Sequence, residues 1–209
     1  MIRCVQTGRS DIPLTPHGEE QVEAKAHLLV GEGSESYQSH ADPKNSILNP
    51  CPDLIDPSNL CTVFVSPRIR AQKTFQLLFK HLPELPHHTL TEECREWDYG
   101  DYEGLKPAEI QELTPGWSIW RDGCRGGESV EEMQTRVDGV IAKVHDWHRR
   151  YKEGDDTVTR DVMIIAHGHF SRVLISRWIQ FPLHLGMFYE FEPISLEILM
   201  GICRNTFHG

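Results

Sequence analysis

The 209-residue sequence contains no run of about 18 consecutive apolar residues, so no segment of it is predicted to cross a bilayer. It has no block of lysines or arginines, and its formal net charge is −10, which argues against a nucleic-acid partner. Its first residues show no charged segment followed by an apolar one. With 39% hydrophobic and 25% charged residues, the chain can bury one sizeable core. We therefore expect one soluble globular domain over residues 1–209, located in the cytoplasm and, as a further option, the nucleus.

The sequence also lacks the cysteine and carboxylate spacings of common metal sites. Its six cysteines include no Cys-x-x-Cys pair, so we expect free thiols. His167 and His169 form a His-x-His pair, but no Asp or Glu follows them before Glu190. The pair His87-His88 lies in a proline-rich segment and is expected to be a solvated loop. We therefore predict a site that uses neither a metal nor another cofactor.

Short apolar runs alternate with amphipathic segments along the chain. The runs CTVFV (61–65) and VMIIA (162–166) are typical of buried strands, and helical spacing follows each of them. A helix is expected from Pro16, capped by Thr15, and a longer one from about residue 128 to 151. This alternation predicts an α/β fold in which a mostly parallel sheet has helices on both faces.

Residues 31–59 interrupt this alternation. Ser, Pro, Asn, Asp and Gly are frequent there, and no hydrophobic period is sustained. Such a composition predicts a surface loop inserted between two structured elements.

Polar side chains follow both predicted strands. Arg68 and Arg70 come after the first strand, and His167 and His169 come after the second, separated by Gly168, which permits a tight turn. In parallel sheets, ligands bind beyond the carboxyl ends of the strands, where loops lead into helix N-termini. Guanidinium groups bind phosphate bidentately and a helix N-terminus adds positive potential, so this edge is predicted to bind a phosphate group.

Glu96, in the stretch REWDYGDYEG, is the candidate acid. If desolvation raises its pKa toward neutrality, it could protonate a departing alkoxide. Structural alternatives exist: a Glu between Arg95 and Trp97 is more often ion-paired, a His at a strand end is usually a hydrogen-bonded structural residue, and Tyr99 is more often a core or lid aromatic. The occurrence of such residues at both strand ends is what favours a functional site.

Five stretches resemble, in the family's order, the histidine phosphatase or phosphoglycerate-mutase-like superfamily. They are TGRSDIPLTPHGEEQ (7–21), VSPRIRAQKT (65–74), REWDYGDYEG (95–104), WRDGCRGGES (120–129) and IIAHGHFSR (164–172). Within the superfamily they look most like the fungal sugar bisphosphatases that act on sedoheptulose 1,7-bisphosphate in the pentose phosphate route. The resemblance implies a three-layer phosphoglycerate-mutase-like fold and metal-independent hydrolysis of sugar phosphate monoesters through a phosphohistidine. A phosphorylated sugar is then the expected partner.

The resemblance also implies roles for residues at matching positions. Arg70 would bind the phosphate, His167 would be the second histidine of the pocket, and Glu96 would protonate the leaving oxygen. The further candidates for substrate or phosphate contacts are Thr7, Gly8, Tyr99 and Gly168.

One family motif does not occur in this chain: the Arg-His-Gly triplet whose histidine attacks phosphorus. Either TGRSDIPLT holds its normal place and the first central strand with its nucleophile loop is absent, or IRCVQT replaces an IRHGQT-like segment and puts Cys4 at the nucleophile's position. The longer, uninterrupted match favours the first alignment. We therefore expect an N-terminally incomplete domain without the first central strand, and a final segment, MGICRNTFHG, that departs from the family pattern.

Three functions stay open on these grounds. The first is a phosphatase for sugar phosphates, and the second is a mutase that transfers phosphate between hydroxyls of phosphoglycerate in the same kind of pocket. The third is a non-catalytic member that binds a phosphorylated ligand, which the missing nucleophile favours. Family similarity makes the phosphatase the leading hypothesis.

Overall fold

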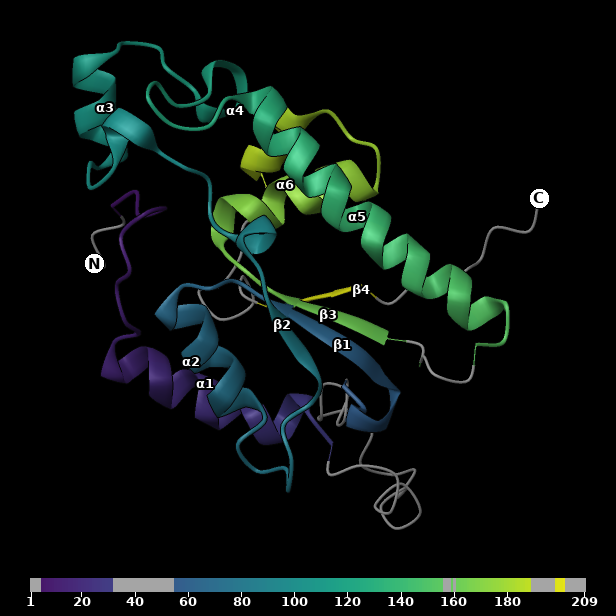
Figure 1. Cartoon of the computed structure of the whole chain (residues 1–209). Coiled ribbons are helices and arrows are strands. Elements are labelled where there is room, and N and C mark those ends of the chain that lie inside the picture. The colour runs from purple at the N-terminus through teal and green to yellow at the C-terminus, as the bar shows by residue number, and fades with distance from the viewer. Residues whose placement is uncertain (1–4, 32–54, 156–158, 160, 189–197, 202–209) are drawn as a thin grey trace, which may run out of the picture.

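The computed structural model describes residues 5–31, 55–155, 159, 161–188 and 198–201, and the fold is reported for these residues. A four-stranded sheet in the order β2-β1-β3-β4 runs through the centre of the molecule (Figure 1). β1 (Leu60–Val65) pairs in parallel with both β2 (His88–Leu90) and β3 (Asp161–Ile165), and β3 pairs antiparallel with β4 (Ile198–Gly201). The predicted mostly parallel sheet is therefore confirmed.

Both predicted strands exist, with boundaries within one residue of those expected. In the described part of the chain no strand lies between β1 and β3, which are hydrogen-bonded neighbours with a register shift between Leu60 and Thr62. The loop expected around His88 was wrong in part, because His88 begins a short edge strand whose side chains are exposed.

Helices cover both faces of the sheet (Figure 1). α1 (Pro16–Leu29) and α2 (Ile69–Leu78) lie on one face, and α5 (Val130–Lys152) and α6 (Gly168–Trp178) lie on the other. Side chains of β1 and β3 alternate between the two cores: Val63, Val65, Met163 and Ile165 join α1 and α2, whereas Phe64, Val162 and Ile164 join α5 and α6. Burial on both faces explains why these strands are continuous apolar runs. The three-layer arrangement is confirmed.

The long helices begin where local capping rules place them. Thr15 Oγ1 accepts the N–H of Gly18 at 3.1 Å at the start of α1. Ser129 and Glu132 form a reciprocal capping box at the start of α5. α6 differs, because its N-cap residue His167 contributes no side-chain cap.

Short elements connect the sheet to the long helices. They are the 3₁₀ turns η1 (Pro57–Asn59), η2 (Glu92–Cys94), η3 (Gly100–Tyr102) and η4 (Leu183–Phe188), and the helices α3 (Pro107–Leu113) and α4 (Ile119–Asp122). α3 and α4 lie beyond the edge of the sheet at which β1 and β3 end (Figure 1).

Most of the loop expected at 31–59 lies outside the described residues. At its described end Ile55 is buried and forms a parallel bridge with Val30, and the surface loop itself stays a prediction. The single-domain boundaries stay a prediction, and the segment 202–209 also lies outside the described residues. No helix in the described part is long and apolar enough to span a membrane.

Candidate active site

The carboxyl ends of β1 and β3 bring the two predicted groups of polar residues to one edge of the sheet. Ser66 follows β1 and His167 follows β3, and His167 Nε2 lies 2.6 Å from Ser66 Oγ. Both side chains are buried. Arg68 is the N-cap residue of α2, and Arg70 lies in the first turn of that helix. The predicted meeting of the two strand ends is therefore observed.

The two arginines hold the segment that contains the predicted phosphate contacts Thr7 and Gly8. Arg70 Nη2 donates to the carbonyl of Thr7 at 2.9 Å, and Nη1 donates to that of Ser10 at 3.2 Å. Arg68 Nε donates to the carbonyl of Gly8 at 2.9 Å. The main-chain oxygen of Thr7 thus contacts Arg70 and that of Gly8 contacts Arg68, and a contact of either residue with a phosphate stays a prediction.

Gly8 also lies tightly against the stretch that follows Glu96. A Cβ at Gly8 would lie 2.1 Å from the carbonyl oxygen of Trp97, so no other residue fits without movement. Glu103 accepts the N–H groups of Gly8 at 3.0 Å and Ser10 at 2.9 Å. The segment 7–10 therefore lies between the arginines and the Glu96 loop.

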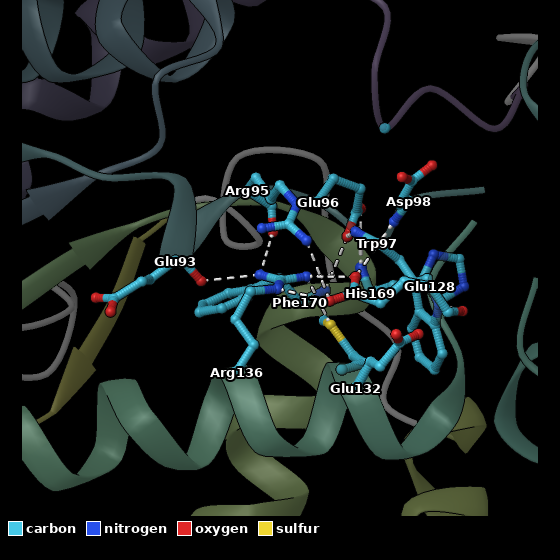
Figure 2. Close-up of polar contacts among 12 residues, drawn as sticks. Glu93, Arg95, Glu96, Trp97, Asp98, Glu128, Glu132, Arg136, His169 and Phe170 are labelled. Atoms are coloured by element: carbon cyan, nitrogen blue, oxygen red, sulfur yellow. Dashed lines mark hydrogen bonds and ion pairs between the residues drawn. The ribbon is translucent and has the colours of Figure 1, made fainter. Parts of the chain in front are cut away.

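Glu96 caps α6 from a distant part of the chain (Figure 2). Its Oε1 accepts the N–H groups of Trp97 and Phe170, both at 2.9 Å, and its Oε2 accepts that of His169 at 3.1 Å. The carboxylate is buried and supplies the acceptor that His167, at the N-cap, does not.

The condition set for Glu96 as an acid, a pKa raised by burial, is not met in the structure as described. Burial raises the pKa of this carboxyl, but His169, His167 and the donated N–H groups of Trp97 and His169 outweigh it and hold the pKa below its usual range. The N-terminus of α6 acts in the same direction because it favours negative charge. Glu96 is therefore an ionised acceptor at neutral pH.

His167 is surrounded by positive charge. Burial, opposed by Glu96 and reinforced by Arg70 and Arg68, lowers the pKa of His167 to about 3. Burial likewise lowers the pKa of His169, against the pull of Glu96. Both imidazoles are neutral at pH 7, Arg68 is paired with Glu92 at 3.6 Å, and Arg70 has no ion pair among the described residues, so Arg70 contributes the unpaired positive charge at this edge.

Tyr99 and Gly168 lie in the same neighbourhood. The Tyr99 hydroxyl is buried and lies 2.8 Å from His169 Nδ1, so its present partner is an imidazole, and a substrate contact stays a prediction. Gly168, the first residue of α6, does not have a positive φ, so its backbone conformation does not by itself require glycine. A Cβ there would lie 3.8 Å from Glu96 Oε2, an ordinary contact distance.

Three residues that make contacts at this site were not recognised as site residues in the sequence. Ser66 was seen only as a strand end, Glu103 only as part of a matched stretch, and Arg136 only as one residue of a helix. Ser66 could have been found because it directly precedes Pro67 at the end of a buried strand. No local signal identifies the partners of the other two residues. The main-chain groups that Glu103 binds lie 93 to 95 residues away in the sequence. The main-chain carbonyls that Arg136 binds lie 41 to 43 residues away.

Neither metal ligands nor reactive thiols gather in the described part of the chain. No group of three or more His, Cys, Asp or Glu side chains there could hold a metal ion. Cys61, Cys94 and Cys124 are free thiols, as expected, and burial raises the pKa of Cys94 and of Cys124 to about 12. The absence of a cofactor requirement stays a prediction.

Comparison with known proteins identifies the family. A model of the histidine phosphatase superfamily (branch 1) matches residues 53–201. The chain belongs to the histidine phosphatase superfamily. Sedoheptulose 1,7-bisphosphatase of Saccharomyces cerevisiae is 34% identical to this histidine phosphatase family member over 184 residues, which cover 82% of the chain and 60% of the yeast protein. The chain therefore spans less than two thirds of that relative.

Other known proteins match over most of the chain. An acid phosphatase of Mycobacterium tuberculosis is 34% identical over 197 residues, which cover 94% of this chain and 76% of that protein. The solved structure of an open reading frame from Mycobacterium tuberculosis matches with a TM-score of 0.62 and 28% identity, covering 95% of this chain and 89% of the other. A structure described as mycobacterial hydrolase 2 has a TM-score of 0.65 at 19% identity and supports the fold alone. The predicted resemblance to the superfamily and to a fungal bisphosphatase is confirmed.

Proposed function

We propose that this chain acts in the hydrolysis of sugar phosphate monoesters through a phosphohistidine intermediate, with Arg70, His167 and Glu96 around the phosphoryl group. One observation carries the proposal. The Arg70 guanidinium is partly buried beside His167, donates to two main-chain carbonyls, and forms no ion pair with a carboxylate among the described residues. A phosphate dianion would supply the missing negative charge.

Each residue has a chemical task in this proposal. Arg70 and Arg68 bind the phosphoryl oxygens, and the neutral imidazole of His167 exchanges its contact with Ser66 for a hydrogen bond to one of them. A bound dianion raises the pKa of Glu96 again, because like charges disfavour ionisation. Glu96 then takes up one proton from water and donates it to the leaving alkoxide, which returns Glu96 to the carboxylate. The leaving group is the sugar hydroxyl.

The attacking histidine of the family is the part that these residues do not supply. Because Arg-His-Gly does not occur in the sequence, binding and proton transfer are assigned to this chain and the attack is not. The same observation favours a second candidate function, in which the chain binds phosphorylated ligands without turning them over.

Hydrolysis of p-nitrophenyl phosphate separates the two functions. The chain as printed is compared with a fusion in which an Arg-His-Gly-bearing strand precedes Thr7. Turnover by the fusion alone supports the phosphatase, whereas phosphate binding without turnover by either protein supports the binding function. Turnover by the printed chain would contradict the view that it lacks a nucleophile.

The substrate class needs a separate assay on an active protein. Release of inorganic phosphate from sedoheptulose 1,7-bisphosphate and from simple sugar monophosphates tests the preference for sugar phosphates. Transfer of phosphate to a second hydroxyl of phosphoglycerate, with no inorganic phosphate released, would support the mutase instead.

A further inference from the structure

Arg136, on α5, lies beside the segment that carries Glu96 (Figure 2). Its side chain is only 9% exposed. Nε and Nη2 donate to the two carboxylate oxygens of Glu128 at 2.8 and 2.7 Å, and Nη2 also lies 2.8 Å from the sulfur of Met133. Nη1 donates to the carbonyl oxygens of Glu93 and Arg95 at 2.8 and 2.9 Å. All five N–H donors of the guanidinium therefore have partners, a pattern that an ammonium cannot reproduce.

The two carbonyl acceptors lie just before Glu96 in the chain. The carbonyl of Arg95 belongs to the same peptide unit as the N–H of Glu96, so its contact with Arg136 fixes that peptide plane. The carbonyl of Glu93 lies in η2, one turn earlier. The direction in which the Glu96 side chain leaves the backbone thus depends on Arg136.

Glu128, the ion-pair partner, holds the chain just after Glu96. Its carbonyl accepts the indole N–H of Trp97 at 2.8 Å. Its main-chain N–H donates to the carbonyl of Asp98 at 2.9 Å, and its carboxylate accepts the N–H of Asp98 at 3.4 Å. The buried pair formed by Arg136 and Glu128 therefore makes hydrogen bonds to the loop on both sides of Glu96.

Arg136 also contacts the helix end that Glu96 caps. Its Cζ lies 5.6 Å from the centre of the Phe170 ring, within the range of a cation–π contact. The N–H of Phe170 is one of the donors to Glu96. One guanidinium thus contacts both the loop that carries the carboxylate and the helix that receives it.

A buried ion pair of this kind adds little net stability, because the cost of removing both charges from water offsets their attraction. Its better attested use is to select one arrangement of the chain. We propose that Arg136 is a positioning residue that holds the Glu96 carboxyl group at the N-terminus of α6. From there Glu96 donates a proton to the leaving alkoxide of a bound phosphate ester. The functional half of this statement rests on the proposed acid role of Glu96.

The first test is the titration of Glu96 in Arg136→Lys, followed by the NMR signal of a ¹³C-labelled Glu carboxyl. His167, His169 and Tyr99 are the titratable groups that face Glu96, and the substitution changes none of them. We expect the pKa of Glu96 to rise by about one unit or more, because its N–H donors lose alignment. Phosphate affinity should stay within about twofold, because lysine keeps the positive charge.

Arg177→Lys is the matched control. Arg177 also forms a bidentate ion pair, with Asp138 at 2.7 and 2.7 Å, and it also joins α6 to α5. It has no described contact with the Glu96 loop, so the pKa of Glu96 should not change in this variant.

A second variant keeps the test decisive if Arg136→Lys does not fold. Arg136→Met with Glu128→Leu replaces the buried pair by apolar side chains, an exchange that proteins often tolerate. The pKa of Glu96 should rise in this double variant too. A pKa equal to that of the parent chain in a folded variant would overturn the proposal.

Turnover by the Arg-His-Gly-bearing fusion adds a catalytic readout. Arg136→Lys should lower kcat about tenfold or more for an alkyl phosphate, and less for p-nitrophenyl phosphate, whose leaving group needs no proton. Equal losses on both substrates would mean that Arg136 does not act through Glu96. If neither protein turns over, the proposed phosphatase fails, while the titration still decides whether Arg136 positions the carboxylate.

Discussion

The site at the carboxyl ends of β1 and β3 has two sides: a β1 side with Arg68 and Arg70, and an α6 side with Glu96. Different contacts hold the two sides in place. On the β1 side, Arg68 and Arg70 donate to uncharged main-chain carbonyls of segment 7–10, and Arg68 also forms an ion pair with Glu92 at 3.6 Å. On the α6 side, Glu96 has three N–H donors, and Arg136 holds its loop within a fully paired, buried network (Figure 2).

This difference separates a β1 side where one guanidinium has only uncharged acceptors from an α6 side where the charged groups have partners. The carbonyl acceptors of Arg70 do not neutralise its positive charge, so this guanidinium is the group that an anion would pair with under the proposed function. The N–H donors around Glu96 satisfy the carboxylate itself, so it needs no ligand to stay in place. Substitutions on the α6 side should therefore change stability, and substitutions on the β1 side should change ligand affinity.

The largest expected effect comes from Glu128→Ala. It leaves the Arg136 guanidinium buried without its partner, and breaking a buried pair in this way costs about 3–5 kcal/mol. The free energy of unfolding in urea measures the loss. Asp138→Ala, which removes the partner of the more exposed Arg177, should cost less than about 1 kcal/mol. Equal losses would mean that the α6 side is not the more rigid side.

Acid should destabilise the protein through His167, which lies between the two sides. Its pKa is about 3 in the folded protein and 6.5 in a model compound, so below pH 6.5 the unfolded chain binds the proton first and stability falls with pH. Between pH 7 and pH 5 this group alone should lower the free energy of unfolding by about 2 kcal/mol.

Urea unfolding at the two pH values, in buffer without phosphate, checks the slope. His169 contributes in the same direction, because its pKa is also lowered. Glu96 adds little in this window, since its stabilising effect is lost only as the pH falls below the usual value of 4.5. His167→Gln should show a shallower slope, and a slope equal to that of the parent would argue against a neutral, buried His167.

Arg70→Met tests the β1 side of the site, to which the proposed function assigns phosphate binding. Loss of a charge-assisted pair with a phosphate group should raise the Kd for inorganic phosphate about 10- to 100-fold, as measured by calorimetry. Arg121→Met is the control, because Arg121 is exposed and paired with Asp122, and its Kd should change less than about twofold. A similar loss in both variants would place the anion elsewhere.

Two glycine substitutions should give the smallest effects and opposite signs. Gly8→Ala pushes a Cβ against the Trp97 carbonyl, where the two sides meet, and should destabilise the protein by about 1 kcal/mol. Gly139→Ala, in the middle of α5 with open space around the new Cβ, should stabilise it by about 0.5–1 kcal/mol. Thermal unfolding distinguishes the two. Stabilisation by Gly8→Ala would show that segment 7–10 is not held against Trp97.

Much of the fold could be predicted because its signals are local. Thr15 before Pro16, and the apolar runs that became β1 and β3, each specify one element within a few residues. β2 was missed because three exposed residues at a sheet edge carry no hydrophobic pattern.

The edge of the sheet at which Arg70 and His167 lie could be predicted, because the carboxyl ends of parallel strands meet there, and their roles stay predictions. The direction of the pKa shift of Glu96 could not be predicted, because two of its donors, His169 and Phe170, lie 73 and 74 residues further along the chain. Burial alone would have raised that pKa, and only the partners reverse the sign.

By itself, the sequence of this histidine phosphatase family member determined β1, β3 and the long helices beside them, and the edge of the sheet at which Arg70 and His167 lie, because hydrophobic period, capping and motif spacing act over short distances. The tertiary structure alone decided which helix Glu96 caps, which charges lie near His167 and that Arg136 contacts the loop that carries Glu96. These depend on contacts between residues far apart in the chain, and the free energy of a buried charge is set by such contacts.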